Sequence, residues 1–167
     1  VIGTLAATDA DGDSLTYSIA ANIDPDSDGT AAFRIEGDQL LVNDPDDFDY
    51  ESNQQLVITA QAEHGGESDT AQITVNLTNV DESPAAVDDN YQALSNADFT
   101  VDAPGVLSND SDPDGDSLTA ELVSGTSNGA LSLNPDGSFT YTSDADFAGD
   151  DTFTYQVSDG LNLSNVA

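Results

Sequence analysis

The sequence predicts an all-β protein made of two tandem Greek-key β-sandwich domains. Three observations carry this prediction: short stretches that alternate apolar and polar residues, acidic turns between them, and an acidic octapeptide that occurs almost unchanged twice. Residues 9–16 read DADGDSLT and residues 112–119 read DPDGDSLT. Because no stretch has a convincing helical period, we expect minimal helix content.

The alternating stretches are predicted to be strands because each is short, rich in β-branched and aromatic residues, and bounded by turn-forming residues. They are residues 14–20, 55–62, 71–78, 118–124, 130–133, 138–142 and 151–157. After the second octapeptide, Leu118, Ala120 and Leu122 share one face of the expected strand. Glu121 then points to the opposite face.

The best domain boundary is the stretch NVDESPAAVDDNY at residues 79–91. Pro84 cannot continue a strand ladder, and acidic residues crowd around it. We therefore predict domains at 1–84 and 85–167. The octapeptide stands nearer to the start of the first domain than of the second, so we expect the first domain to lack its opening strand. The second domain ends at LNLSNVA, residues 161–167, where one more strand would be expected. Such ends are typical of a segment taken from a tandem array.

The charge balance is extreme, and it excludes several classes of function. The chain has 33 Asp and Glu residues against one Lys or Arg, a formal net charge of −32. No basic patch exists that would bind nucleic acid or an anionic membrane surface, and no apolar run is long enough to span a bilayer. Carboxylates crowded into turns repel one another, so folding calls for positive charge from outside the chain. Divalent cations are the obvious source.

The acidic turns favour calcium among those cations. Alternate short carboxylates in a tight turn converge on one point, as Ca²⁺ requires, whereas Zn²⁺ prefers His and Cys and the chain has one His and no Cys. Residues 110–121 satisfy the EF-hand pattern, but a strand follows Gly115 where an EF-hand needs a helix. Residues 24–29, DPDSDG, begin the same pattern but have Ile35 at its twelfth position. A solvated turn and a weak ion site are equally supported there.

Several ordered motifs resemble known families. Residues 1–19, 33–42, 49–51 and 73–84 resemble the G-T, F-x-I, D-x-E and linker segments of a bacterial cadherin-like repeat. Residues 86–91, 103–125, 129–142 and 147–160 resemble the bacterial cadherin-like/Ig-like (VCBS-type) tandem repeats of giant secreted surface adhesins. The resemblance implies extracellular modules with Ca²⁺ bound where successive domains meet.

Carried over to this sequence, the resemblance implies two sets of calcium ligands. The set at the junction of the two domains consists of Asp49, Glu51, Asn79, Asp81, Glu82, Asp112, Asp114 and Asp159, with Asp88, Asp89, Asp110 and Asp116 as neighbouring candidates. The other set, Asp9, Asp11 and Asp13, faces an upstream domain. His64 stands where the cadherin pattern has Asp, which weakens the upstream set. As a lone His without partners, it is better explained as a surface residue than as a zinc ligand.

The resulting prediction is a calcium-rigidified stalk or cell-adhesion module of a large bacterial surface protein, with neighbouring repeats of the same chain as partners. Two alternatives stay open: binding of a polysaccharide or of an identical protomer, for which Tyr50 and Tyr91 are the least committed aromatic residues, and self-assembly into filaments by strand exchange. Catalysis is not expected, since the carboxylates lie in polar turns and His64 has no nucleophile elbow to serve.

Overall fold

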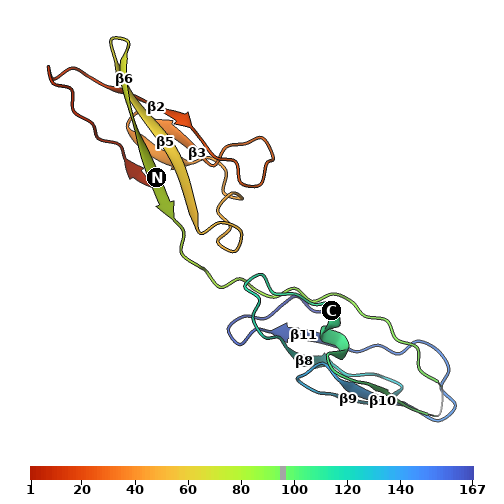
Figure 1. Cartoon of the computed structure of the whole chain (residues 1–167). Coiled ribbons are helices and arrows are strands. Elements are labelled where there is room, and N and C mark those ends of the chain that lie inside the picture. Colours follow the sequence, from red (N-terminus) through yellow and green to blue (C-terminus); the bar gives the residue numbers. More distant parts are fainter. Residues whose placement is uncertain (95–96) are drawn as a thin grey trace. The chain divides into compact units, whose positions relative to one another are not determined.

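The computed structural model describes residues 1–94 and 97–167. The chain divides into two compact units, Val1–Val80 and Asp81–Ala167, which are treated separately below (Figure 1). Within the described residues every regular element is a β-strand, apart from one short 3-10 helix, η1 (Gly105–Ser108). The all-β prediction is therefore confirmed, while the domain limits at residues 84 and 85 stay a prediction. Among the described residues, no helix has the length and hydropathy needed to cross a membrane.

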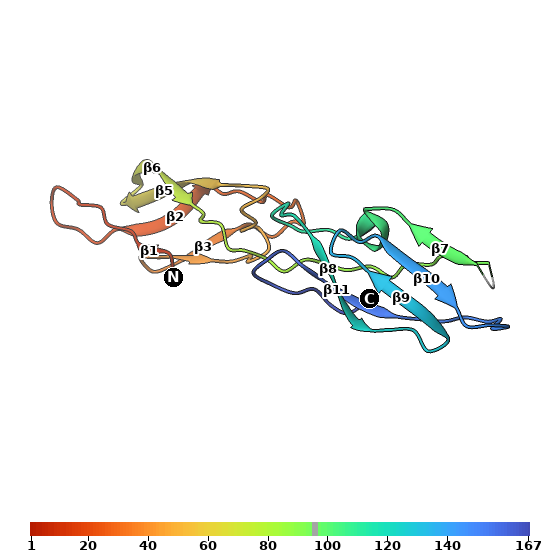
Figure 2. The ribbon, with the colours of Figure 1, turned by 90° about the horizontal axis from the view of Figure 1, so that it is seen from below.

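The first unit contains two antiparallel three-stranded sheets. One sheet has the order β1 (Gly3–Thr4), β4 (Gln39–Val42), β3 (Phe33–Glu36). The other has the order β2 (Thr16–Ala21), β5 (Gln55–His64), β6 (Glu67–Asn76). Figure 2 shows the strands of the first unit as two layers.

The core of the first unit lies between these sheets. Its buried members are Ala32, Phe33, Leu40, Leu56 and Ile58. On β5, Leu56 and Ile58 are buried while the intervening Val57 is 42% exposed, which is the period-two pattern of a strand with one face on a core. The two layers and the shared core make the unit a β-sandwich.

The second unit also has two sheets. One has the order β7 (Asp98–Val101), β10 (Phe139–Ser143), β9 (Gly129–Leu133), and the other pairs β11 (Thr154–Ser158) with β8 (Thr119–Ser124). All of these pairings are antiparallel. The buried core residues come from both sheets and from the segments before them, and are Ala86, Val106, Ala120, Phe139, Tyr155 and Val157.

Each predicted strand overlaps an observed one, and the four strands outside the predicted stretches are the short β1, β3, β4 and β7. The shared face predicted for β8 is only partly buried. Ala120 is buried, whereas Leu122 is 47% exposed. The pairing of β8 with β11 shifts register beside Leu122, between Thr154 and Tyr155, and such an irregularity bends a strand away from its neighbours.

Candidate metal centre

The second octapeptide forms a tight turn around the carboxylate of Asp112. The amide of Gly115 donates to the Asp112 carbonyl at 3.2 Å, and Gly115 takes a φ of 76°, which glycine adopts without strain. The amide of Asp116 donates to Asp112 Oδ1 at 3.1 Å. The other carboxylate oxygen, Asp112 Oδ2, is buried and has no hydrogen-bond partner in the described part of the chain. The turn thus holds one oxygen and leaves the second available to a ligand.

The segment after β11 supplies a second carboxylate in the same condition. Asp159 Oδ1 accepts the amides of Leu161 and Asn162, each at 2.6 Å. These amides hold the pKa of Asp159 below its ordinary value, so this carboxylate is ionised. Asp159 Oδ2 is buried and without a hydrogen-bond partner among the described residues.

The first residues of the second unit join this group. The side-chain amide of Asn162 donates to Asp81 Oδ2 at 2.6 Å, and the backbone amide of Glu82 donates to Asp114 Oδ2 at 2.9 Å. Partial desolvation raises the pKa of Asp81. Four nearby carboxylates raise it further, in decreasing order those of Asp159, Asp114, Asp116 and Asp112. The field of its neighbours therefore opposes the negative charge on Asp81.

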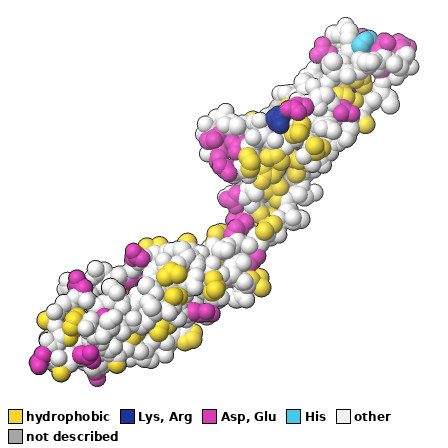
Figure 3. Space-filling model, turned by 180° about the vertical axis from the view of Figure 1, so that it is seen from behind, with side chains coloured by type: hydrophobic (Ala, Val, Ile, Leu, Met, Phe, Trp, Pro, Cys, Tyr) yellow, Lys and Arg dark blue, Asp and Glu magenta, His cyan; other side chains and the backbone are white. Residues whose placement is uncertain are grey.

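This acidic cluster has the chemistry of a calcium site. All the side-chain atoms that it offers to a metal are oxygens, and two of them are buried without a hydrogen-bond donor among the described residues. The chain's one Lys or Arg residue, Arg34, forms an ion pair with Glu36 in the other unit. Ca²⁺ takes six to eight oxygen ligands, mostly carboxylates and carbonyls. Figure 3 shows the acidic side chains of one face gathered in clusters. The residues present fit Ca²⁺ better than Zn²⁺, for which the cluster offers no imidazole or thiolate.

The first octapeptide forms the same turn in different surroundings. Asp9 Oδ1 accepts the amides of Asp11 and Asp13 at 2.8 and 3.4 Å, and these bonds hold the pKa of Asp9 below its ordinary value. Nδ1 of His64 lies 3.7 Å from Oδ2 of Asp13. The imidazole of His64 is thus a neighbour that the paired strand brings to this loop.

The other ligands implied by the resemblance lie in two places. In the first unit, the hydroxyl and amide of Ser52 donate to Asp49 at 2.7 and 3.2 Å, and these bonds lower the pKa of Asp49. The amide of Glu51 donates to the same carboxylate at 3.0 Å, so Asp49 and Glu51 share one turn. Asn79, near the end of this unit, is exposed.

In the second unit, Asp89 and Asp110 gather around the hydroxyl of Tyr155 instead of joining the acidic cluster. The Tyr155 oxygen lies 3.1 Å from Asp89 Oδ2 and 3.2 Å from Asp110 Oδ2, and the amide of Val87 donates to Asp110 Oδ1 at 2.8 Å. Burial raises the pKa of both carboxylates and of Tyr155. This network ties the incoming segment to β11, while the side chain of Asp88 is exposed.

The EF-hand pattern is not formed as a unit. The carboxylate of its first residue, Asp110, accepts a hydrogen bond from the Tyr155 hydroxyl. Its last residue, Glu121, lies opposite Gln156 in the pairing of strands β8 and β11. Sequence reasoning missed two participants, Tyr155 and Asn162. In the sequence, Tyr155 has the pattern of an ordinary core residue of an alternating strand. For Asn162, closeness to Asp159 is the one signal of a role at the site.

Cadherin extracellular domains are among the solved structures that are similar to this chain in fold. Drosophila N-cadherin EC1-4 has a TM-score of 0.60 at 15% sequence identity, over 98% of this chain and 42% of that chain. The protocadherin GammaB4 extracellular domain has a TM-score of 0.50 at 19% identity, over 97% of this chain and 30% of that chain. This chain thus spans less than half of either structure. At these identities the likeness is one of fold, and it defines a cadherin-like β-sandwich protein.

The sequence comparison gives the family. The sequence model of the bacterial cadherin-like domain matches residues 81–167, and the chain belongs to that family. Members are extracellular, adhesion-type modules that are typically non-enzymatic and generally bind Ca²⁺. No curated protein matches the sequence.

Proposed function

We propose that the acidic cluster of the second unit binds Ca²⁺ and that the chain is a calcium-rigidified stalk or adhesion module of a large bacterial surface protein. One observation carries the proposal: Asp112 Oδ2 and Asp159 Oδ2 are both buried, and neither has a hydrogen-bond partner in the described residues. A buried carboxylate oxygen without a donor is costly, and a bound cation offsets that cost.

The proposed ligands are the carboxylates of Asp81, Asp112, Asp114 and Asp159, with Glu82 beside them. Asn162 orients Asp81, and the Leu161 and Asn162 amides fix Asp159, so part of the shell is held before the ion arrives. Asp116 contributes its amide to the Asp112 turn and its charge to the cluster. Ca²⁺ would supply the positive charge that the chain lacks.

The resemblance to cadherin repeats adds Asp49, Glu51 and Asn79 as ligands from the preceding repeat. An ion held by both repeats would fix the angle between them, because moving either repeat would break bonds to the metal. It would also relieve repulsion within a chain whose net charge is −32. Asp9, Asp11 and Asp13 are proposed to face an upstream repeat, as a weaker site in which His64 replaces one carboxylate.

Calorimetric titration of the full chain with Ca²⁺ tests the site. Asp112→Asn keeps an oxygen for the Asp116 amide but removes the charge, and we expect it to weaken the strongest binding event by about tenfold or more. The matched variant Asp9→Asn makes the same change in the first octapeptide and should leave that event unchanged. Equal affinities in wild type and Asp112→Asn would overturn the assignment.

Chelation tests the mechanical role. Removing Ca²⁺ from the full chain should lower its melting temperature and increase its hydrodynamic radius, because the repeats would then move independently. Light scattering and thermal unfolding, each with and without chelator, measure the two effects. A chelated chain with the same radius would argue against rigidification even if the ion binds.

The alternative of a sugar-binding or homophilic surface gains no support from the aromatic residues. Tyr91 is 37% exposed, yet its ring packs edge-on against Phe139 with centroids 5.1 Å apart and also contacts Phe99. Its exposed part is the edge of a core cluster. Calcium-dependent adhesion through neighbouring repeats is therefore the function we propose.

A further inference from the structure

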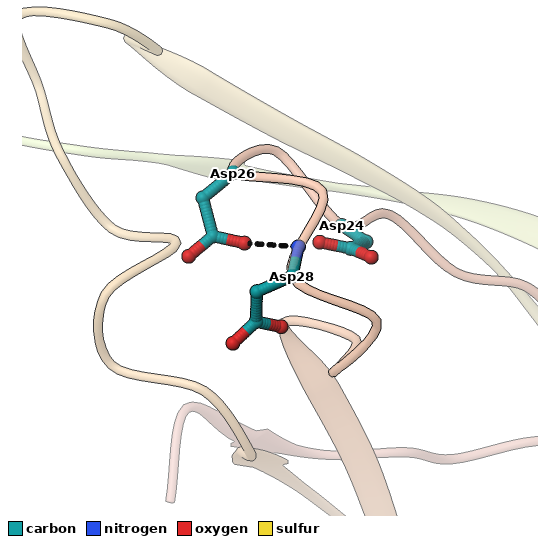
Figure 4. Close-up of side chains that lie close together, drawn as sticks. All are labelled: Asp24, Asp26 and Asp28. Atoms are coloured by element: carbon teal, nitrogen blue, oxygen red, sulfur yellow. Dashed lines mark hydrogen bonds between the residues drawn. The ribbon is translucent and has the colours of Figure 1, made fainter.

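A second group of carboxylates lies in the first unit, in the turn between β2 and β3. Carboxylate oxygens of Asp24, Asp26 and Asp28 lie within 4.8 Å of one another (Figure 4). The amide of Asp28 donates to Asp26 Oδ1 at 3.0 Å, and that of Gly29 donates to Asp24 Oδ2 at 3.1 Å. Asp24 Oδ1 is buried without a hydrogen-bond partner in the described part of the chain.

A fourth carboxylate reaches this turn from the connection between β4 and β5. Asp47 is only 1% exposed, and its Oδ1 accepts the amide of Asp26 at 3.2 Å. Asp47 Oδ2 is buried and has no hydrogen-bond partner among the described residues. An almost fully buried carboxylate thus accepts an amide of this turn with one oxygen, while its other oxygen has no hydrogen-bond partner among the described residues.

No basic side chain of the chain compensates for this charge. Arg34 pairs with Glu36, and His64 lies beside Asp13. Carboxylate oxygens of Asp24, Asp26 and Asp28 lie within 4.8 Å of one another, and the nearly fully buried Asp47 contacts the same turn. The turn is therefore an electrostatically unfavourable arrangement that a cation would stabilise.

We infer that Asp24, Asp26, Asp28 and Asp47 form a second Ca²⁺ site, wholly within the first unit. In the EF-hand pattern the twelfth residue supplies a carboxylate, but here that position is Ile35, which packs against the core from β3. Asp47 would take its place from a different loop. The ion would clamp the β2–β3 turn to the β4–β5 connection, and this role does not depend on the site proposed in the second unit.

The donor set selects the ion. Four carboxylates from two loops suit Ca²⁺, with its variable coordination number, better than Mg²⁺, which demands near-ideal octahedral geometry and keeps its waters. Zn²⁺ would need nitrogen or sulfur ligands, and the group has none.

Amide NMR of the full chain tests this site separately from the other one. The titration is made in the Asp112→Asn variant, so that the second unit lacks that carboxylate, and it follows the amides of Asp26, Asp28 and Gly29. We expect these signals to shift saturably with Ca²⁺. Unchanged signals up to about 10 mM Ca²⁺, roughly tenfold above the weakest range of extracellular calcium modules, would overturn the inference. Saturation by Mg²⁺ at the same concentrations would overturn the choice of ion.

Three variants identify the ligands. Asp47→Asn should abolish the shifts, whereas the control Asp44→Asn should retain them, since Asp44 is 9% exposed in the same loop and its carboxylate accepts the Asp46 amide. Asp28→Asn covers the case that Asp47→Asn fails to fold, because Asp28 is exposed and its replacement disturbs no core contact. It should weaken the apparent affinity about tenfold or more. Unchanged affinity in Asp28→Asn would contradict the site.

Discussion

The two octapeptides fold into the same turn but have different neighbours. In each, the first aspartate accepts amides from its own loop, and a glycine with positive φ closes the turn. Each octapeptide ends in a threonine whose hydroxyl donates to a backbone carbonyl on the paired strand, Thr16 to Glu63 at 3.1 Å and Thr119 to Ser158 at 3.2 Å. The residue after that carbonyl is His64 in the first unit and Asp159 in the second.

This difference shows that the octapeptide alone does not make a cation site. Asp112 in the second turn and Asp159 beside it each have one buried carboxylate oxygen without a hydrogen-bond partner in the described residues. Beside the first turn, Asp13 has an imidazole neighbour. One residue on the paired strand thus differs between the two turns: Asp159 beside the proposed calcium site, and His64, whose imidazole lies near Asp13, beside the first turn. The following predictions test that comparison, beginning with the largest effect.

Replacing Asp159 with histidine, the residue at the matching position of the first unit, should remove the calcium response of the second unit. Asp159→His replaces a carboxylate with an imidazole, a poor calcium ligand. Ca²⁺ at 100-fold above its Kd adds about 2.7 kcal/mol to stability, which for a domain of this size corresponds to roughly 10 °C or more in Tm. We expect thermal unfolding of the variant to lose this gain. Asp102→His, an exposed control, should keep it, and a full gain in Asp159→His would break the comparison.

The reverse exchange should introduce a calcium response in the first unit. His64→Asp places a new carboxylate near Asp13, and without Ca²⁺ the like charges should lower the melting temperature. Ca²⁺ should restore at least part of that loss. His64→Asn, which adds no charge, serves as the control. A melting temperature lowered equally with and without Ca²⁺ would show that more than this residue separates the two loops.

Matched glycine substitutions should have equal effects on the two turns. Gly12 and Gly115 have φ values of 82° and 76°, and an added Cβ would meet no atom within 4 Å at either position. Alanine therefore introduces backbone strain alone, which costs about 1 kcal/mol. Denaturant unfolding in chelator should give the same loss of stability for Gly12→Ala and Gly115→Ala. Clearly unequal losses would contradict the equivalence of the turns.

The pH dependence of stability should differ in sign between Asp9 and Asp110. Loop amides lower the pKa of Asp9 below 3.8, so its contribution is present above pH 3.8 and is lost as pH falls through the lowered value. Burial raises the pKa of Asp110 above 3.8, although hydrogen bonds from the Val87 amide and the Tyr155 hydroxyl act to lower it. The Asp89 carboxylate contacts the same hydroxyl. Its contribution is present below pH 3.8 and is lost as pH rises through the raised value.

Asparagine variants report these opposite slopes. Relative to wild type, Asp9→Asn should become less stable as pH rises from about 3 to 6, and Asp110→Asn should become more stable over the same range. Melting temperatures in chelator measure both. Slopes of the same sign would mean that the two loops do not differ in the way their hydrogen bonds and burial indicate.

Much of the fold was accessible from the sequence because period-two alternation reports directly which face of a strand is buried. The residues of β5, β8 and β11 were predicted on this basis, whereas β1, β3, β4 and β7, with two to four residues each, are too short to show a period. The alternation did not reveal that Leu122 is exposed. That depends on a register shift in the partner strand.

The residues of the candidate sites were likewise only partly predictable from the sequence. Asp112 and Asp159 were predicted as ligands from motifs, but the placement of Asp110 and Asp89 around Tyr155 was not, because it requires segments far apart in the sequence to meet. Asp47 was missed for the same reason. It follows a different strand from the turn that it contacts.

By itself, the sequence determined the all-β class and the two acidic turns, since both depend on alternation and on hydrogen bonds between residues at most four positions apart. Only the tertiary structure decided which carboxylates are buried without a donor. That property depends on residues brought together from distant strands, such as Asp159 and Asp81 in the second unit and Asp47 in the first. The cost of burying a charge is set by its surroundings, which no local motif specifies.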